Sequence, residues 1–391
     1  MAERLAIDGG KPIRTQKIPI NLPYFDKNDE EAVVERLRST WVSGDGPKCR
    51  EFEQEFATYL GVKHAFIVTS CTTALHLAFM IAELEGGEAI VPDFTYTSTA
   101  LGPILDGTHV RLCDVDYETA NINPAAIRKQ INKQTRAIVP VDYAGHPCRI
   151  DEINAIADEH GLIVVQDSAQ SCGAKFKGKR VGSQARMTCF SFHSSKNLVT
   201  GEGGCLVTDD DELAEKARIM REKGTNKHLF ISDQSRLGYY EYQMKGNSYV
   251  QTDILGALAL SQLKKLEWMN ALRARHAAYL TEGLQGIDGL MLPQVSADVE
   301  PNWSLYTIRV PEAHLMRIRD GLNGEGIGCN THYHPLHVSA YYKAQARNSD
   351  ESFPNADRVF RTLLRLPMYV QLTTEELDHM IAGVKKVFAN L

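Results

Sequence analysis

The sequence is poor in the features that mark membrane and secreted proteins. Its longest notable apolar run, Ile254 to Leu260, is far shorter than the about 20 residues that a transmembrane helix needs. The N-terminus carries an early acidic residue and no long apolar core, so it does not resemble a signal peptide. The eight cysteines are scattered and form no Cys-x-x-Cys pair, which indicates reduced thiols. We therefore expect a cytoplasmic protein.

An excess of positive charge is also missing. The chain has 43 lysines and arginines against 49 aspartates and glutamates, for a net charge of -6, and no basic tail stands out. Nucleic acid is a poor candidate partner, because neutralising its phosphates requires concentrated positive charge. Of the 391 residues, 43% are hydrophobic and 24% charged, which is typical of globular proteins. This length allows two or three domains.

Short apolar runs alternate with helix-like stretches in the first half of the chain. Several runs are apolar throughout, as in strands buried on both faces of a sheet. The expected strands are 65–69, 89–91, 110–115, 137–141, 162–166, 188–192 and 205–208, and the expected helices between them are 72–84, 124–131 and 151–160. This alternation predicts an α/β fold with a mostly parallel sheet.

The pattern changes after residue 208. A charged helix is expected at 209–222, a long helix or two at 254–284, and a final helix at 374–391. The last third of the chain has α+β character. We therefore expect a large N-terminal α/β domain over residues 1–260 and a smaller C-terminal α+β domain over residues 261–391.

Polar residues follow two of the expected strands, where ligands of parallel sheets bind. Ser70, Cys71 and Thr72 stand at a helix start, where free N–H groups favour an anion, although an ordinary helix cap is the simpler explanation of these hydroxyls. Asp167 ends another strand, with Gln170 nearby. This carboxylate either caps the next turn or faces a cationic ligand atom, because a buried unpaired charge is costly.

Lys196 follows a third strand and precedes a glycine-rich turn at 201–204. Most lysines are solvated, but a lysine held among apolar strands loses its proton more readily and can attack carbonyls. The glycines would let the backbone pass close to a bound group. An anion cradle, a carboxylate and an amine are the groups that pyridoxal phosphate needs, so the three strand ends favour this cofactor.

An ordered series of motifs runs nearly from end to end. The motifs are Gly9-Gly10-Lys11-Pro12, Trp41-Val42-Ser43-Gly44-Asp45-Gly46-Pro47, Ser70-Cys71-Thr72-Thr73-Ala74-Leu75-His76, Val91-Pro92-Asp93-Phe94-Thr95-Tyr96, Asp167-Ser168-Ala169-Gln170, Phe190-Ser191-Phe192-His193-Ser194-Ser195-Lys196-Asn197, His332-Tyr333-His334-Pro335-Leu336-His337 and Leu366-Pro367-Met368. In these motifs the chain resembles the DegT/StrS family of pyridoxal-phosphate sugar aminotransferases. The resemblance implies the aspartate aminotransferase-like fold (fold type I) and a homodimer with shared active sites.

The resemblance also implies a role for each matching residue. Lys196 matches the lysine of the internal aldimine, and Asp167 matches the partner of the pyridine nitrogen. Gln170 matches the residue that bonds the phenolic oxygen of the cofactor, and Tyr96 matches an aromatic residue stacked on its ring. The positions that contact the phosphate are matched by Cys71, Thr72 and Ser191.

The sequence departs from the commoner family pattern at Gly246-Asn247-Ser248-Tyr249-Val250. Ser248 stands where an Asn usually reaches the phosphate in the neighbouring subunit, and Val250 stands where an Arg is usual. A Gly-Ser-Ser-Tyr-like version, together with Glu222-Lys223-Gly224-Thr225-Asn226, is similar to the branch that aminates nucleotide-linked 4-keto-6-deoxy sugars. Ser248 is therefore a weaker assignment to the cofactor site.

The resemblance implies transfer of an amino group, with L-glutamate as the expected donor, to a keto group of a nucleotide-linked sugar. The product class would be deoxyamino sugars, such as those of O-antigen lipopolysaccharide. Alternatives are a 3-keto sugar or cyclitol as acceptor, a sugar dehydratase, and a cofactor-binding regulator without turnover. Lys196 argues against the dehydratase, whose known relatives carry histidine at that position.

Two other patterns have a weaker claim to function. His332, His334 and His337 could suggest a metal, but no cysteine or carboxylate lies among them, so we expect none; His332 is instead expected to contact the sugar or its phosphate. Residues 173–180 nearly form a phosphate-binding loop, but Arg180 stands where Ser or Thr would bind magnesium. A solvated hairpin that turns at Gly178 is the preferred interpretation.

Overall fold

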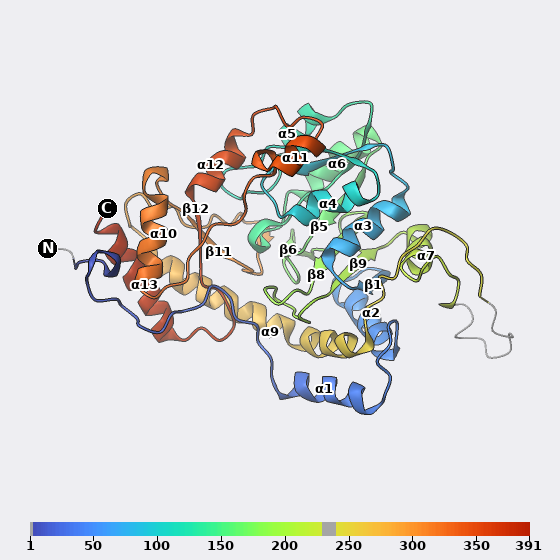
Figure 1. Cartoon of the computed structure of the whole chain (residues 1–391), viewed down its shortest axis with the longest axis horizontal. Coiled ribbons are helices and arrows are strands. Elements are labelled where there is room, and N and C mark those ends of the chain that lie inside the picture. The colour runs from blue at the N-terminus through green and yellow to red at the C-terminus, as the bar shows by residue number, and fades with distance from the viewer. Residues whose placement is uncertain (1–2, 229–239) are drawn as a thin grey trace.

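The computed structural model describes residues 3–228 and 240–391 of the chain (Figure 1). Its centre is a seven-stranded sheet in the order β1-β9-β8-β5-β4-β2-β3. The strands are β1 (His64–Val68), β2 (Glu88–Pro92), β3 (His109–Cys113), β4 (Thr135–Ile138), β5 (Ile163–Asp167), β8 (Met187–Ser191) and β9 (Gly204–Thr208). All neighbouring pairs are parallel except the two that involve β9. The predicted mostly parallel sheet is confirmed, and six strands direct their carboxyl ends to one edge.

Helices cover both faces of this sheet. On one face, α3 (Cys71–Ala82) and α7 (Asp211–Met220) pack on apolar side chains such as Phe66 and Leu206. On the other face lie α2 (Pro47–Leu60), α5 (Pro124–Gln130), α6 (Ile150–His160) and the first half of α9 (Asp253–Leu284). The α/β/α sandwich follows from strands that are apolar on both faces, since each face must be covered.

A separate apolar cluster lies at the end of the molecule where both termini are found (Figure 1). It is built on a two-stranded antiparallel sheet of β11 (Tyr306–Arg309) and β12 (Leu363–Leu366), which α10 (Leu315–Gly324) and α13 (Thr374–Phe388) cover. Leu5 and Ile18 from the start of the chain are also buried in it.

The remaining elements connect or flank these two parts. They are α1 (Lys27–Arg38), α4 (Thr97–Leu105), β6 (Lys175–Phe176), β7 (Lys179–Arg180), β10 (Val299–Glu300), α11 (Ala340–Gln345), α12 (Pro354–Thr362) and the short 3-10 helices Ala6–Asp8, Tyr143–Gly145, Glu312–His314 and Leu336–Val338. The predicted hairpin at 175–180 is confirmed, with Gly178 in a left-handed conformation at φ 72°. Within the described ranges, no helix is long and apolar enough to cross a membrane.

Residues 254–284 form one helix rather than two, because no proline or capping signal interrupts α9 over its 32 residues. Leu263 and Leu266 of this helix pack under the central sheet, whereas Leu280 and Leu284 belong to the cluster around β11 and β12. The division of the chain at residue 260 stays a prediction, and that boundary lies within α9.

Candidate active site

A pocket of about 520 Å³ opens at the carboxyl-end edge of the central sheet. Eight of the nine predicted site residues line it: Cys71, Thr72, Tyr96, Asp167, Gln170, Ser191, Lys196 and His332. They come from five separate segments of the chain, which the sheet brings together. Only Ser248 of the predicted set does not line this pocket.

The start of α3 forms one wall. Ser70 caps the helix, because its side chain accepts a hydrogen bond from Thr73 N at 3.1 Å while the Thr73 hydroxyl bonds back to Ser70 N at 2.9 Å. The cap interpretation is thus correct for Ser70. The N–H groups of Cys71 and Thr72 donate to no acceptor within the described part of the chain. These free donors at the positive end of a helix fit an anion such as phosphate.

Thr72 and Ser98 extend this wall with hydroxyl groups. Their side-chain oxygens lie 2.7 Å apart, and Ser98 belongs to the first turn of α4. Ser191, at the end of β8, also lines the pocket and is buried. The wall therefore offers hydroxyl groups as well as backbone donors to a bound anion.

Asp167 ends β5 and is buried. One carboxylate oxygen accepts a hydrogen bond from the Thr99 hydroxyl at 2.7 Å, and the other accepts from Ala169 N at 3.1 Å. Burial raises the pKa of Asp167, and these bonds together with Lys196 only partly oppose the shift. Cys71 Sγ lies 3.9 Å from the oxygen that Ala169 N bonds, whereas the oxygen that Thr99 bonds keeps a second lone pair for a further cationic donor.

Lys196 lies in the loop that follows β8, within the same pocket. Burial lowers its pKa, as does Arg365, whereas Cys71 and Asp167 oppose the shift. The Lys196 side chain makes no hydrogen bond to another residue in the described part of the chain. A half-buried lysine of this kind carries its free amine more often than a surface lysine, as a nucleophile requires.

Gln170 is fixed from two sides. Its carbonyl oxygen accepts from Ala144 N at 2.7 Å, and its amide donates to the Tyr333 hydroxyl at 2.9 Å. The Tyr333 ring lies 5.4 Å from that of Tyr96, whose side chain is 56% exposed at the pocket mouth. Tyr96 is therefore free to stack on a planar ligand, while Gln170 is held at the pocket wall.

His332 faces Arg365 rather than open solvent. The Arg365 guanidinium donates a hydrogen bond to His332 Nδ1, so the neutral ring carries its proton on Nε2. Burial, together with the positive charges of Arg365 and Lys196, lowers the pKa of His332 to about 4. His332 is thus a neutral group at pH 7, able to donate one hydrogen bond from Nε2 but carrying no charge to attract a phosphate.

The sequence interpretation missed four residues of the site. Ser98 and Thr99 are polar residues inside a helix, and Tyr333 was noted only as part of a motif. Arg365 carried a readable signal, because it is a charge within the apolar strand Leu363–Leu366. Its place in the pocket, however, depends on the distant pairing of β12 with β11.

In the glycine-rich turn, Gly204 packs directly against the backbone at the start of α3. A Cβ atom on Gly204 would lie 2.4 Å from the carbonyl carbon of Ser70 and 2.5 Å from the nitrogen of Cys71. The expectation that these glycines admit a ligand is wrong for Gly204. Its missing side chain lets β9 lie against the start of α3, which positions that helix in the wall of the pocket.

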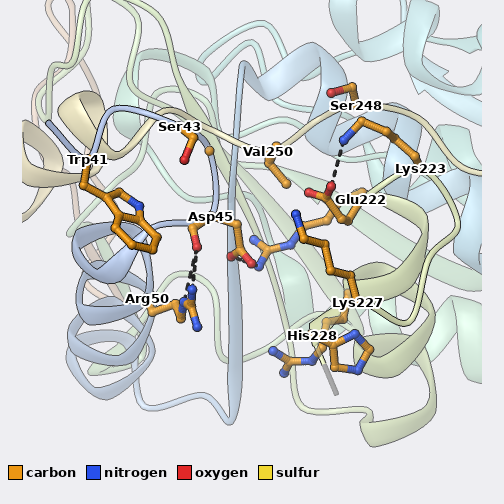
Figure 2. Close-up of a pocket in the computed structure, with 13 residues that line it drawn as sticks. Trp41, Ser43, Asp45, Arg50, Glu222, Lys223, Lys227, His228, Ser248 and Val250 are labelled. Atoms are coloured by element: carbon orange, nitrogen blue, oxygen red, sulfur yellow. Dashed lines mark hydrogen bonds and ion pairs between the residues drawn. The ribbon is translucent and has the colours of Figure 1, made fainter. Parts of the chain in front are cut away.

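Ser248 lies in a second pocket of about 840 Å³ (Figure 2). Figure 2 shows Trp41 and Arg50 on one side of it and Ser248 with Lys223 on the other. Its lining includes five cationic residues, Arg50, Arg218, Arg221, Lys223 and Lys227, together with the carboxylates of Asp45 and Glu222. Ser248 is exposed here and does not approach Lys196 of its own chain.

The three histidines of the 332–337 segment point to different partners. His337 Nδ1 lies 2.6 Å from Asp93 Oδ2, His334 packs edge-on against Phe360, and His332 faces Arg365. No group of three or more His, Cys, Asp or Glu side chains that could hold a metal occurs in the ranges that the structure describes. All eight cysteines are buried and none is in a disulfide.

Comparison with known proteins gives a consistent result. The profile of the DegT/DnrJ/EryC1/StrS aminotransferase family matches residues 23–385. The spore coat polysaccharide biosynthesis protein SpsC of Bacillus subtilis is 36% identical over 384 residues, covering 96% of this chain and 98% of its own.

Two solved structures resemble the whole fold. DesV of S. venezuelae, in complex with a ketimine intermediate, has a TM-score of 0.87 at 32% identity and covers 96% of this chain and all of its own. PseC of Helicobacter pylori, an aminotransferase of pseudoaminic acid biosynthesis, has a TM-score of 0.89 at 27% identity over 96% of this chain and 100% of that chain. The chain thus has fold type I and belongs to the DegT/DnrJ/EryC1/StrS family of pyridoxal phosphate-dependent aminotransferases.

Proposed function

We propose that the protein transfers an amino group from L-glutamate to the keto group of a nucleotide-linked sugar, and that the acceptor is a 4-keto-6-deoxyhexose. The relatives with polysaccharide and sugar-derived products support a sugar acceptor. The 4-keto position is supported by the segments 222–226 and 246–249 of the sequence. The observation that carries the proposal is the meeting of Lys196, Asp167 and the free N–H groups of α3 in one pocket.

The residues of this pocket fit pyridoxal phosphate. The unpartnered N–H groups of Cys71 and Thr72 suit its phosphate, with Ser191 close by. Asp167, whose pKa is raised by burial, suits a protonated ring nitrogen. Tyr96 suits the ring face and Gln170 the phenolic oxygen, while Lys196 supplies the amine for the aldehyde carbon.

Lys196 has two tasks in the proposed reaction. It would hold the cofactor between turnovers. Once free, its amine would take the proton from the donor carbon and deliver it to the carbon on the other side of the transferred nitrogen. The lowered pKa of Lys196 keeps a larger share of the amine unprotonated, as a base requires. When bound, the cofactor supplies the carrier of the amino group and a ring that stabilises negative charge.

Asp167 supports this chemistry from the far end of the site. As a carboxylate it keeps the ring nitrogen protonated, so that the ring accepts electrons. Thr99 and Ala169 N fix the orientation of the carboxylate, which holds this charge in one place.

Ser248 fits the proposal only through a second subunit. In its own chain it lies in a pocket apart from Lys196, so a contact with cofactor phosphate requires a partner chain. We propose a homodimer in which Ser248 of each chain completes the site of the other. Sedimentation of the purified protein as a dimer supports this, whereas a monomer with full activity would contradict it.

The first experiment measures absorbance of the purified protein with pyridoxal phosphate. We expect a bound violet-absorbing band in the wild type and its loss in Lys196→Ala. Lys179→Ala is the matched control, because that exposed lysine lies in the hairpin of β6 and β7, away from the pocket. A wild type that takes up no cofactor would contradict the proposal.

The second experiment identifies the acceptor. The loaded protein is incubated with L-glutamate and a panel of nucleotide-linked 3-keto and 4-keto sugars, and products are read by mass spectrometry. An amino sugar supports transamination, and a deoxygenated product supports the dehydratase. Tight cofactor binding without turnover of any panel member supports the regulator.

A further inference from the structure

Asp142 is a buried carboxylate next to the residues of the Lys196 pocket. It follows β4, is 0% exposed, and is not one of the described residues that line the pocket. Its backbone nitrogen donates to the backbone oxygen of Asp167 at 3.2 Å, and Asp167 N donates to the backbone oxygen of Pro140 at 2.8 Å. Asp142 therefore lies directly beside the end of β5.

The carboxylate of Asp142 accepts hydrogen bonds from four groups. Its Oδ2 accepts from the Ser168 hydroxyl at 2.8 Å and from the Ser171 hydroxyl at 2.7 Å. Its Oδ1 accepts from Cys148 N at 2.8 Å, and the amide of Gln166 donates to both oxygens at 3.0 Å. All four donors are neutral and come from buried residues. A carboxylate suits this position because both of its oxygens only accept.

Three of the four donors flank Asp167 in one short segment, residues 166–171. Gln166 precedes Asp167, and Ser168 and Ser171 follow it. The backbone nitrogen that donates to Asp167 Oδ1 at 3.1 Å belongs to Ala169, which lies between the two serines. The two serine bonds therefore fix the place of that N–H group, and with it the direction of the Asp167 carboxylate.

Another buried carboxylate shows what distinguishes Asp142. Glu325 is also 0% exposed, but it forms an ion pair with Lys386 at 2.9 Å and accepts from Ala6 N at 2.8 Å. These bonds tie the two ends of the chain together and involve no residue that lines the Lys196 pocket. Asp142 instead bonds the segment that supplies Asp167 to the pocket.

We propose that Asp142 is a positioning residue, which directs the Asp167 carboxylate at the ring nitrogen of pyridoxal phosphate through its bonds to the segment 166–171. This inference rests on the aminotransferase function proposed above and adds a residue outside the pocket. The effect is one of geometry, because a small displacement of a contacting group costs much of its interaction. Burial is the main cause of the raised pKa of Asp167, and the negative charge of Asp142 is a minor cause.

Gln170 lies in the same segment but has two anchors of its own. Its carbonyl oxygen accepts from Ala144 N, and its amide donates to the Tyr333 hydroxyl. We therefore expect the loss of Asp142 to disturb the contact with the ring nitrogen more than the contact with the phenolic oxygen. Deazapyridoxal phosphate separates the two contacts, because a C–H group replaces its ring nitrogen while its phenolic oxygen, aldehyde and phosphate remain.

The test compares the binding of these two compounds and needs no substrate. The full chain is freed of cofactor and titrated with pyridoxal phosphate and with deazapyridoxal phosphate, and the ratio of the two dissociation constants is the readout. Asp142→Ala removes all the bonds. Asp142→Asn keeps the shape, since its oxygen can accept from Cys148 N and its amide can donate to the serine hydroxyls, which also accept. Ser171→Ala removes one bond, and Glu325→Gln is the matched control for a buried carboxylate.

We expect Asp142→Ala to weaken the binding of pyridoxal phosphate by about 10–100-fold, as the loss of a group that orients a direct ligand contact does elsewhere. The binding of deazapyridoxal phosphate changes less than about 2-fold, within the range of ordinary substitutions away from a contact. Ser171→Ala shifts the ratio in the same direction by about 2–5-fold, the effect of one hydrogen bond. Asp142→Asn and Glu325→Gln keep the ratio of the wild type.

Three results would overturn the proposal. One is an equal loss of both compounds in Asp142→Ala and Ser171→Ala, which would make Asp142 a support of the general structure. Another is an unchanged ratio in Ser171→Ala, which also decides the matter if circular dichroism shows that Asp142→Ala does not fold. The third is a loss in Asp142→Asn as large as that in Asp142→Ala, which would assign the effect to the charge. A wild type that binds neither compound contradicts the proposed function instead.

Discussion

Arg221 and Arg365 are both buried, at 3% and 9% exposure, but their surroundings differ. Arg221 lies beside β1, where its guanidinium donates to the backbone oxygen of Ile67. It pairs with Glu53 and, at 3.0 Å, with Asp45. Burial alone would lower the pKa of Arg221, but these carboxylates outweigh it and raise the pKa. Arg365 has a neutral histidine as its partner, and burial lowers its pKa.

The two arginines thus differ in whether the chain itself supplies a carboxylate to pair with the buried charge. The charge of Arg221 is neutralised within the chain, so removing Arg221 would leave a buried carboxylate without its partner. Arg365 has no carboxylate partner among the described residues, so its buried charge costs stability until an anion binds. Three experiments test this contrast.

The largest expected effect is in the Arg221 region. Arg221→Met leaves the Glu53 carboxylate buried without its partner, and we expect a loss of about 3–5 kcal/mol in the free energy of unfolding. Urea denaturation of the cofactor-free protein measures it. Arg365→Met, which strands no carboxylate, is expected to change that free energy by less than about 1 kcal/mol. Equal losses in the two variants would break the contrast.

A smaller effect of opposite sign is expected at Lys196. Burial lowers the pKa of the folded lysine, so below about pH 10.4 the unfolded chain holds the proton more firmly than the folded chain. Lys196→Met should therefore raise the free energy of unfolding at pH 7 by about 0.5–2 kcal/mol in the cofactor-free protein. The gain should shrink as the pH rises from the lowered pKa of the folded lysine towards about 10.4, the pKa of the unfolded lysine, and vanish above it. A destabilised variant at pH 7 would show that Lys196 supports the fold.

The finest test compares two histidines of one segment. The hydrogen bond from His337 to Asp93 raises the pKa of His337, whereas burial and two cations lower the pKa of His332 to about 4. Proton NMR titration should give widely separated midpoints, with signals assigned from His332→Gln and His337→Gln.

The stability consequences of the two histidines have opposite signs. His332 destabilises the fold progressively as the pH falls from about 6.5 towards 4, because only the unfolded ring takes up a proton there. His337 stabilises the fold below about pH 6.5, and this contribution is lost as the pH rises through its own raised pKa. A common midpoint for both rings would remove the evidence that the pocket is positively charged.

The sequence allowed prediction of the sheet and of the residues at its strand ends. Strands such as β8 are buried along their whole length, and Asp167 and Lys196 stand at or just after the ends of such strands. Arg365 could not be placed, because its position depends on pairing between Thr307 and Arg365 across 58 residues of chain. Ser248 was grouped with the cofactor residues by resemblance alone, and only the folded chain separates it from them.

The cluster around β11 and β12 also constrains when the protein can finish folding. Leu5 and Ile18 are buried there beside Leu377 and Val387, and Asn390 donates to the backbone oxygen of Glu3 at 2.9 Å. These contacts join residues 3–18 to residues 377–390. The central sheet has all its strands once residue 208 has emerged, whereas this cluster also needs residue 387. Arg365 is therefore synthesised after Asp167, which ends β5, and after Lys196, which lies in the loop that follows β8.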